Sequence, residues 1–187
     1  MFTISLSKVL SDIETSIYEA SSHCETWWAL GFSDNRKEFK DVFESSDYNY
    51  FLHTCCVANQ VAMFMALSRA FDTCGKSSRF RELKRLLEAE GYESLARLID
   101  EQLAPYQSLI SRILTIRSQL IAHTETNKTD EDVFIANGVK PDELKSLIDT
   151  AKGALIQVAF TLREYNRCFT KGLHNQSALE VLKKLDS

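Results

Sequence analysis

The chain has 187 residues, 44% of them hydrophobic and 26% charged, which suffices for one domain with a real core and is ordinary for a soluble globular protein. Its formal net charge of −4 excludes nucleic-acid binding through the whole surface, so any such binding needs a local basic patch. Only 6 glycines and 2 prolines interrupt the chain, and this scarcity favours long helices.

We expect neither a targeting segment nor a disulfide framework. The first residues lack a basic leader followed by an apolar stretch, so we expect no signal peptide. The most apolar run, Cys55–Leu67, is split by amide side chains, and we expect it to be too short and too polar to cross a bilayer. The 5 cysteines are odd in number and lack paired spacing, which predicts a reduced, cytoplasmic protein.

Apolar residues repeat at spacings of three and four along most of the chain, which predicts helices. Pro105 is expected either to kink the fourth helix or to start a new one. The connection 32–49 is rich in charge and serine and has room for a short helical turn. The helices are expected over residues 6–31, 50–73, 79–90, 93–123 and 140–171, with a further short helix within 172–187.

The segment 50–73 is apolar on nearly all sides, so we expect this helix at the centre of a bundle. Its residues Leu67 and Phe71 are predicted to pack against Ile113, Ile116 and Leu120. These last three residues recur on one line of a helix, and they define the buried face of the segment 109–125.

The helix over 79–90 has a plausible N-cap in Ser78 and a plausible C-cap in Gly91. The stretch 76–85 carries five positive side chains and one negative one, a net of +4. It is interpreted either as a solvated helix face, which we slightly prefer, or as a patch that contacts phosphates. The candidate nucleic-acid contacts are Arg79, Arg81, Lys84 and Arg85.

Two ionisable residues interrupt the apolar face of 109–125. Arg117 falls within the apolar arc, and because a guanidinium keeps its charge it needs a partner or a wet cleft. His123 lies at the edge of the arc, near the predicted helix end. Alone, such an arginine often reaches out to water, and such a histidine often complements the helix dipole. Together, at the seam of a helix pack, they indicate a site.

The sequence offers little support for a metal-binding site. His53 and Cys56 are three apart on a predicted helix and offer two ligands, but no second pair has a matching spacing. We therefore expect no metal site and no cofactor.

The string IRSQLIAH, from Ile116 to His123, resembles the signature of the HEPN family, an arginine and a histidine separated by a short helical spacer. The ending Ala122–Glu125 is similar to the abortive-infection, AbiU-type branch, as are ALSRAFD over Ala66–Asp72 and ELKRLLEAEG over Glu82–Gly91. The resemblance implies an all-α, antiparallel, HEPN-like bundle of about five to six helices, with residues 1–187 forming a single domain.

The resemblance also implies a function, a metal-independent endoribonuclease toxin that acts in phage defence. Arg117 and His123 would be catalytic, with Asp72, Ser118 and Glu125 in support and Asp72 as the partner of Arg117. The histidine would transfer protons and the arginine would hold the phosphate. A homodimer would supply a second histidine, and an antitoxin protein is a further possible partner.

Two other interpretations stay open. In the first, the chain is an inactive HEPN-like module for nucleotide binding, RNA binding or dimerisation, which the acidic net charge and Ser118 favour. Active ribonucleases of the family often carry Asn, Asp or His directly after the arginine. In the second, Arg117 only pairs with Asp72 and His123 has no role.

Overall fold

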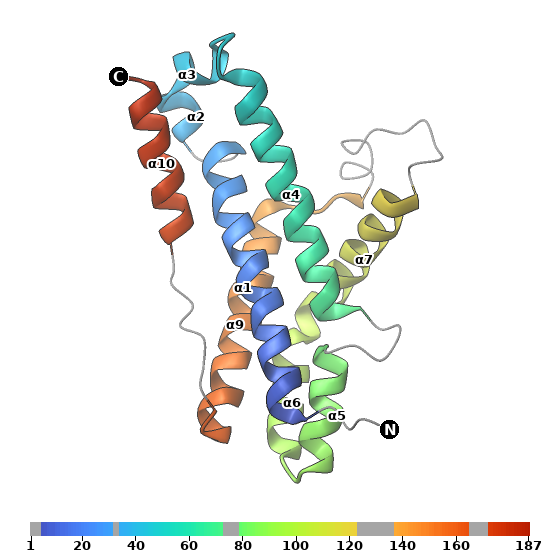
Figure 1. The fold of residues 1–187 in the computed structure, drawn as a ribbon. Coiled ribbons are helices and arrows are strands. Elements are labelled where there is room, and N and C mark those ends of the chain that lie inside the picture. Colours follow the sequence, from blue (N-terminus) through green and yellow to red (C-terminus); the bar gives the residue numbers. More distant parts are fainter. Residues whose placement is uncertain (1–4, 32–33, 73–78, 123–136, 165–171) are drawn as a thin grey trace.

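The computed structural model describes residues 5–31, 34–72, 79–122, 137–164 and 172–187, with the backbone alone at 120–122. All regular structure in these ranges is helical (Figure 1), which confirms the expected all-α bundle. The elements are α1 (Leu6–Gly31), α2 (Asn35–Glu38), α3 (Lys40–Glu44), α4 (Asn49–Phe71), α5 (Phe80–Ala89), α6 (Glu93–Leu103), the 3₁₀ turn η1 (Ala104–Tyr106), α7 (Gln107–Ala122), α9 (Pro141–Leu162) and α10 (Leu173–Leu185).

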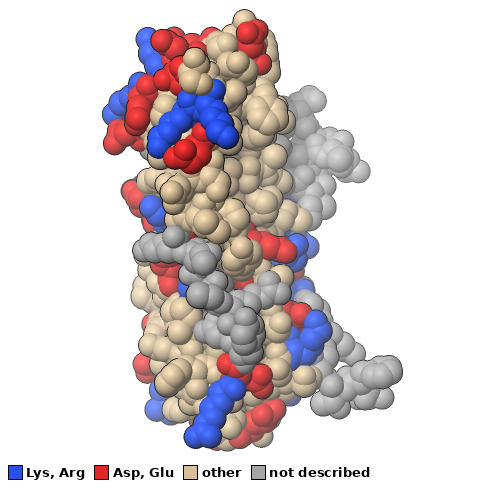
Figure 2. All heavy atoms as spheres, turned by 60° about the vertical axis from the view of Figure 1, so that its left-hand side comes forward, with Lys and Arg blue, Asp and Glu red and all other residues tan. Residues whose placement is uncertain are grey.

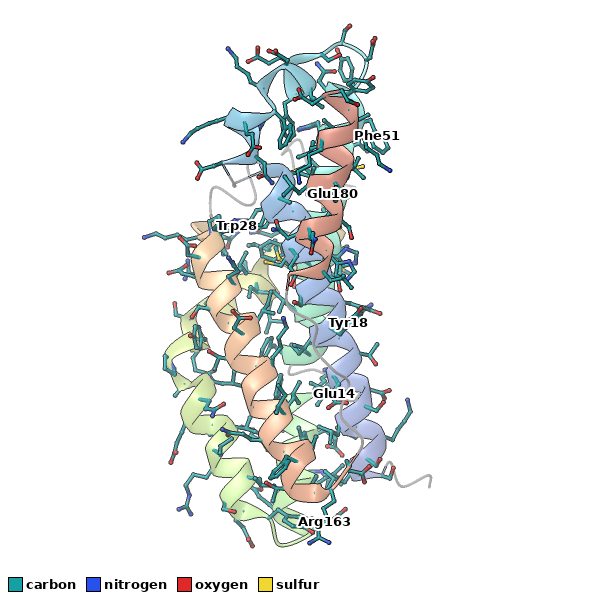
Figure 3. The ribbon with its side chains drawn as sticks, turned by 90° about the vertical axis from the view of Figure 1, so that its left-hand side faces the viewer. Glu14, Tyr18, Trp28, Phe51, Arg163 and Glu180 are labelled. Atoms are coloured by element: carbon teal, nitrogen blue, oxygen red, sulfur yellow. The ribbon has the colours of Figure 1, made fainter. Side chains whose placement is uncertain are left out.

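The centre of the bundle is α1, not α4 as the apolar pattern predicted. α1 contacts α4, α9, α10 and α5, and Figure 1 shows it between α4 and α9. The C-terminal half of α4 is buried from Met63 onward, but Tyr50 and Phe51 near its start are 80% and 65% exposed, and Phe51 stands at the upper end of Figure 3. α4 thus has more apolar surface than its neighbours cover.

By length and composition alone, α4 is the one helix among the described residues that could cross a membrane. This differs from the expectation for the shorter run Cys55–Leu67, because the helix extends beyond that run at both ends. The core helix of a soluble protein can have the same length and composition. The buried residues of α4 face α1 and α7.

The main core joins α1, α4, α5, α6, α7 and α9. Leu67 and Phe71 share this core with Ile113 and Ile116, as predicted. For Leu120 the structure describes the backbone alone, so this part of the prediction is not tested. The described part of the segment 32–49 contains the two short helices α2 and α3. Phe39, between them, and Val42 of α3 belong to a separate small cluster. The members of that cluster are Leu30, Phe39, Val42, Leu52 and Leu182, with Leu179 and Leu185 packed against it.

Helix ends follow local chemistry. Gly91 adopts φ +84° after α5, and Tyr92 N–H donates to Leu87 O at 2.7 Å, the pattern of a glycine-terminated helix. α9 ends at Leu162 instead of continuing to residue 171. Arg163 takes a left-handed φ of 56°, and Glu164 N–H donates to Ala159 O at 3.0 Å, which closes the helix. Pro105 lies in η1, so a new helix starts after it.

Acidic and basic side chains alternate on the face shown in Figure 2, and neither sign dominates it. The surface of the bundle also carries ion pairs between helices, such as the one between Arg69 of α4 and Glu19 of α1. This face offers no broad basic surface, which agrees with the formal net charge of −4.

Candidate functional site

Arg117 lies on α7 at the border of its buried face. Ile113 and Ile116 are fully buried, which confirms that face, whereas the Arg117 side chain is 38% exposed. The sequence pattern placed Arg117 in the middle of the apolar arc. It is more open than that because α7 packs against α4 and η1, and its C-terminal end extends to the side of the bundle (Figure 1).

Asp72 and Arg79 are held at the ends of two neighbouring helices. Asp72 is the C-cap residue of α4, and its N–H donates to Ser68 O at 2.8 Å. Arg79 is the N-cap residue of α5, with extended backbone. Phe71 and Phe80 stack with centroids 5.1 Å apart, so Asp72, directly after Phe71, and Arg79, directly before Phe80, are held next to the core.

The Asp72 carboxylate is shared by two guanidinium groups. Arg79 Nη1 lies 3.5 Å from Asp72 Oδ1 and donates to Asp72 O at 3.2 Å. Arg117 Nη1 lies 3.9 Å from Asp72 Oδ2, so the expected partner of Arg117 is present. The second distance is too long for a hydrogen bond. We call Asp72, Arg79 and Arg117 the arginine cluster.

The arginine cluster has two permanent positive charges and one negative charge. The side chains of Asp72 and Arg79 are only 17% and 14% exposed, so Arg117 is its open member. Arg117 Nε is buried and donates to no acceptor among the residues described. A guanidinium that is loosely paired and partly open to solvent suits an oxyanion such as a phosphate.

Arg79 belongs to the arginine cluster, although its place in the sequence suggested a member of the basic stretch 76–85. A usable signal existed: Asp72 and Arg79 flank one short connection, after the last residue of one helix and before the first of the next. Lys84 forms an ion pair with Asp100, and Arg85 donates two hydrogen bonds to Glu82, which lower the pKa of that carboxyl. The patch is thus largely neutralised, which favours the solvated-face interpretation.

The other predicted site residues either lie apart from the arginine cluster or fall outside the described residues. Ser118 is exposed, and its Oγ donates to Leu114 O at 2.9 Å along its own helix. His123 and Glu125 lie outside the described residues, one and three positions after the last residue of α7. Within the described ranges, no group of three His, Cys, Asp or Glu side chains could hold a metal ion.

Three hydrogen bonds join the chain after residue 136 to α7. Asn137 Nδ2 donates to Gln119 Oε1 at 3.0 Å, and Arg112 donates to Gly138 O at 2.7 Å and to Glu143 Oε2 at 3.2 Å. The start of α9 is therefore attached to the helix that carries Arg117.

Comparison with known proteins gives one family. The family model described as AbiU2, of the HEPN group, matches residues 4–175, which span every member of the arginine cluster. Neither the curated proteins nor the solved structures contain a match to the chain.

Proposed function

This chain belongs to the HEPN AbiU2 family and is an abortive-infection protein of HEPN type, and on that premise we propose that it cleaves RNA without a metal ion. The observation that supports the proposal is the arginine cluster: Arg117 presents a loosely paired guanidinium, and His123 follows it by six positions in the sequence. The site residues of the proposal are Arg117 and His123, with Asp72 as the positioning carboxylate.

Arg117 would bind the scissile phosphate. Its contact to Asp72 is an ion pair at 3.9 Å and not a hydrogen bond, so turning toward a phosphate sacrifices little. Arg79 keeps the carboxylate in place during that movement through its contact at 3.5 Å. A planar, always charged guanidinium also stabilises the added negative charge of a pentacoordinate phosphorus.

His123 would transfer protons. An imidazole with an ordinary pKa of about 6.5 can take the proton of a ribose 2′-OH or give one to the leaving 5′-oxygen. The 2′-oxygen then attacks the phosphorus, the bond to the 5′-oxygen breaks, and a 2′,3′-cyclic phosphate remains. One histidine does not readily serve as base and acid in the same step, so a two-fold homodimer would bring a second His123 to a shared cleft.

The biological role in this proposal is that of a toxin in phage defence, acting in the cytoplasm on cellular or phage RNA and held inactive by an antitoxin protein. Cleavage of RNA would stop growth of the infected cell, which is what abortive infection requires.

A second candidate function is a HEPN-like binding module without catalysis. One observation favours it: Ser118, the residue after the arginine, directs its hydroxyl to Leu114 O and contributes nothing to the cluster. Such a module would bind RNA or nucleotide through Arg117 and act through dimer or partner contacts.

Purified protein incubated with a mixed RNA pool in EDTA tests the proposal. We expect cleavage by the wild type and loss of cleavage in His123→Ala and Arg117→Ala, with partial rescue by Arg117→Lys because an ammonium lacks the planar fork. The matched controls are His53→Ala and Arg69→Ala, which remove exposed side chains elsewhere. Melting curves on the same preparations verify folding.

Two results would change the interpretation. If wild type and His123→Ala degrade RNA equally well, the catalytic interpretation is wrong and the binding-module interpretation takes its place. If the wild type binds RNA in an Arg117-dependent manner without cutting it, the binding module is correct. Light scattering that shows a monomer at working concentration would contradict the shared dimer site.

A further inference from the structure

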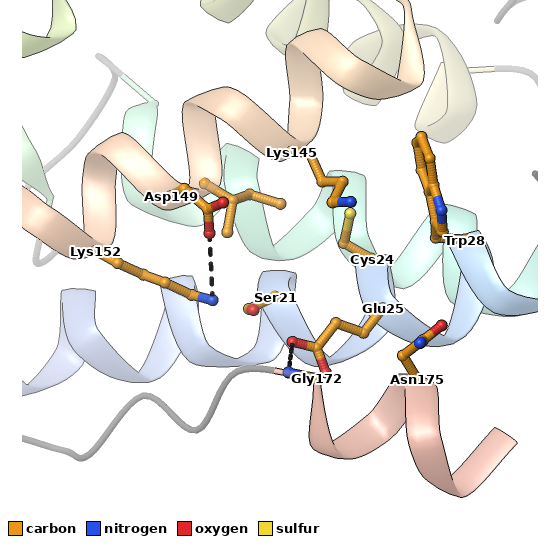
Figure 4. A pocket seen from close by; sticks show the side chains of 10 residues that line it. Ser21, Cys24, Glu25, Trp28, Lys145, Asp149, Lys152, Gly172 and Asn175 are labelled. Carbon is orange, nitrogen blue, oxygen red and sulfur yellow. Dashed lines mark hydrogen bonds and ion pairs between the residues drawn. The ribbon is translucent and has the colours of Figure 1, made fainter. Parts of the chain in front are cut away.

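A cleft lies between α1, α9 and the start of α10, and none of its lining residues belongs to the arginine cluster. Its volume is about 180 Å³ (Figure 4). Four charged side chains line it, two of them positive (Lys145 and Lys152) and two negative (Glu25 and Asp149). Trp28, Cys24 and Ile148 supply apolar surface. We call it the α1–α9–α10 cleft.

Both carboxylates in this cleft are already engaged. Glu25 of α1 accepts hydrogen bonds from the backbone N–H groups of Gly172 and His174, at 2.9 and 3.1 Å, and so neutralises the positive end of α10. Asp149 forms an ion pair with Lys152 at 3.8 Å, and the Lys152 side chain is only 11% exposed. Neither acid is therefore available to attract a cation.

Among the described residues, Lys145 is the cleft cation that has no carboxylate partner. Its Nζ lies 4.4 Å from the ring centroid of Trp28, and no carboxylate of the described residues lies within ion-pair distance. A cation over an indole ring keeps its full charge and can still bind an anion from the cleft side. Figure 4 shows the Lys145 side chain directed along the wall of the cleft toward Trp28.

The other lining residues of the cleft contribute a hydrogen-bond acceptor and apolar surface. Asn175 Oδ1 is buried and accepts no hydrogen bond in the described structure, so the cleft has an unused polar atom on its α10 side. Burial raises the pKa of the Cys24 thiol to about 11, so sulfur presents a neutral, apolar surface at neutral pH. This sulfur, the Trp28 indole and Ile148 are the apolar surfaces of the cleft.

We propose that the α1–α9–α10 cleft binds a small organic anion with a flat apolar body and a hydrogen-bonding group. The acid group lies beside Lys145, the flat body lies against Trp28 and Ile148, and the polar group reaches Asn175. Such a ligand contacts α1, α9 and α10 at once, so its binding stabilises the attachment of α10 to the bundle. The proposal does not depend on RNA cleavage.

The test uses 4-hydroxyphenylacetate as the probe, because it combines a carboxylate, one aromatic ring and a hydroxyl. Its neutral analogue 4-hydroxyphenylethanol lacks the charge, and acetate lacks the ring. Binding to the full chain is followed by calorimetry and by the fluorescence of the tryptophans, of which Trp28 lines the cleft. We expect saturable binding of the probe alone and, on binding, slower amide exchange in α10.

The variant Lys145→Gln should weaken probe binding about tenfold, the effect of losing one contact to a charged group. Lys145→Arg should retain most of it. The matched control Lys183→Gln, on α10 and paired with Glu180, should bind as the wild type does. The proposal is overturned if the probe shows no saturable binding, if the neutral analogue binds as tightly, or if Lys145→Gln has no effect while the variant is folded.

Discussion

The two contacts of Asp72 should differ in strength, and this difference can be measured without any activity assay. Asp72 and Arg79 are 17% and 14% exposed and 3.5 Å apart, so their coupling should approach that of a hydrogen bond to a charged group, about 1.5–3 kcal/mol. Arg117 is 38% exposed and 3.9 Å away, so its coupling to Asp72 should be below about 1 kcal/mol, as for surface pairs.

Double-mutant cycles separate these values. The variants are Asp72→Asn, Arg79→Met, Arg117→Gln and the two doubles that contain Asp72→Asn, each unfolded in urea and followed by far-UV circular dichroism. The hydrogen bond from Arg79 to Asp72 O survives Asp72→Asn, so the cycle reports the side-chain contact alone. The exposed pair Lys183–Glu180 provides the baseline, at about 0.2–0.5 kcal/mol.

Salt gives a second criterion. The Arg117 coupling should fall further when ionic strength rises, because its side chain is the more exposed one. The reasoning fails if Asp72 couples to Arg117 as strongly as to Arg79. In that case the guanidinium is fixed by the carboxylate, and turning toward a phosphate would cost more than the proposed mechanism allows.

Three further predictions concern stability. Ile116→Ala should lower the unfolding free energy by about 2–5 kcal/mol in urea titrations, because Ile116 is fully buried, while exposed Thr115→Ala should stay within about 0.5 kcal/mol. Arg163→Gly should raise it by about 0.5–1 kcal/mol, because φ is +56° there, and a decrease would show that the Arg163 side chain is stabilising. The pKa of the Cys24 thiol is about 11 in the folded protein against 9.0 in a free thiol, so the folded state loses stability as the pH rises from 9 to 11. Over this range the unfolding free energy of the wild type should fall by about 2–3 kcal/mol more than that of Cys24→Ala. Parallel curves of unfolding free energy against pH for the two proteins would contradict this.

The sequence predicted the helices well because their period is local. The bounds of α1, α4, α5 and α10 agree closely with the expected segments, since each carries its own apolar repeat. The end of α9 was missed because Arg163 adopts a left-handed conformation that sequence rules assign to glycine or asparagine. The central position was assigned to α4 because composition shows how apolar a helix is, not how many neighbours it has.

The arginine cluster was predictable only in part. A charge within the apolar face of 109–125 indicated that Arg117 needs a partner, and the family resemblance indicated Asp72. The sequence contains one signal for Arg79, its place across a short connection from Asp72. Whether the two side chains meet depends on how α4 and α5 pack, which the spacing along one helix does not encode. Likewise, Lys145 and Asn175 reach one cleft only because α9 and α10 both pack on α1, and no local pattern connects them.

The small cluster around Leu182 gives the bundle two cooperative units of unequal size. α10 is held by that cluster and by Glu25, whereas α1 takes part in the main core along most of its length. Elements with fewer buried contacts open at a lower free energy than the whole fold. α10 should therefore detach and reattach many times for each global unfolding event, while the arginine cluster on α4, α5 and α7 stays assembled. A protease or a binding protein would meet the C-terminal helix in its released form far more often than it would meet the unfolded chain.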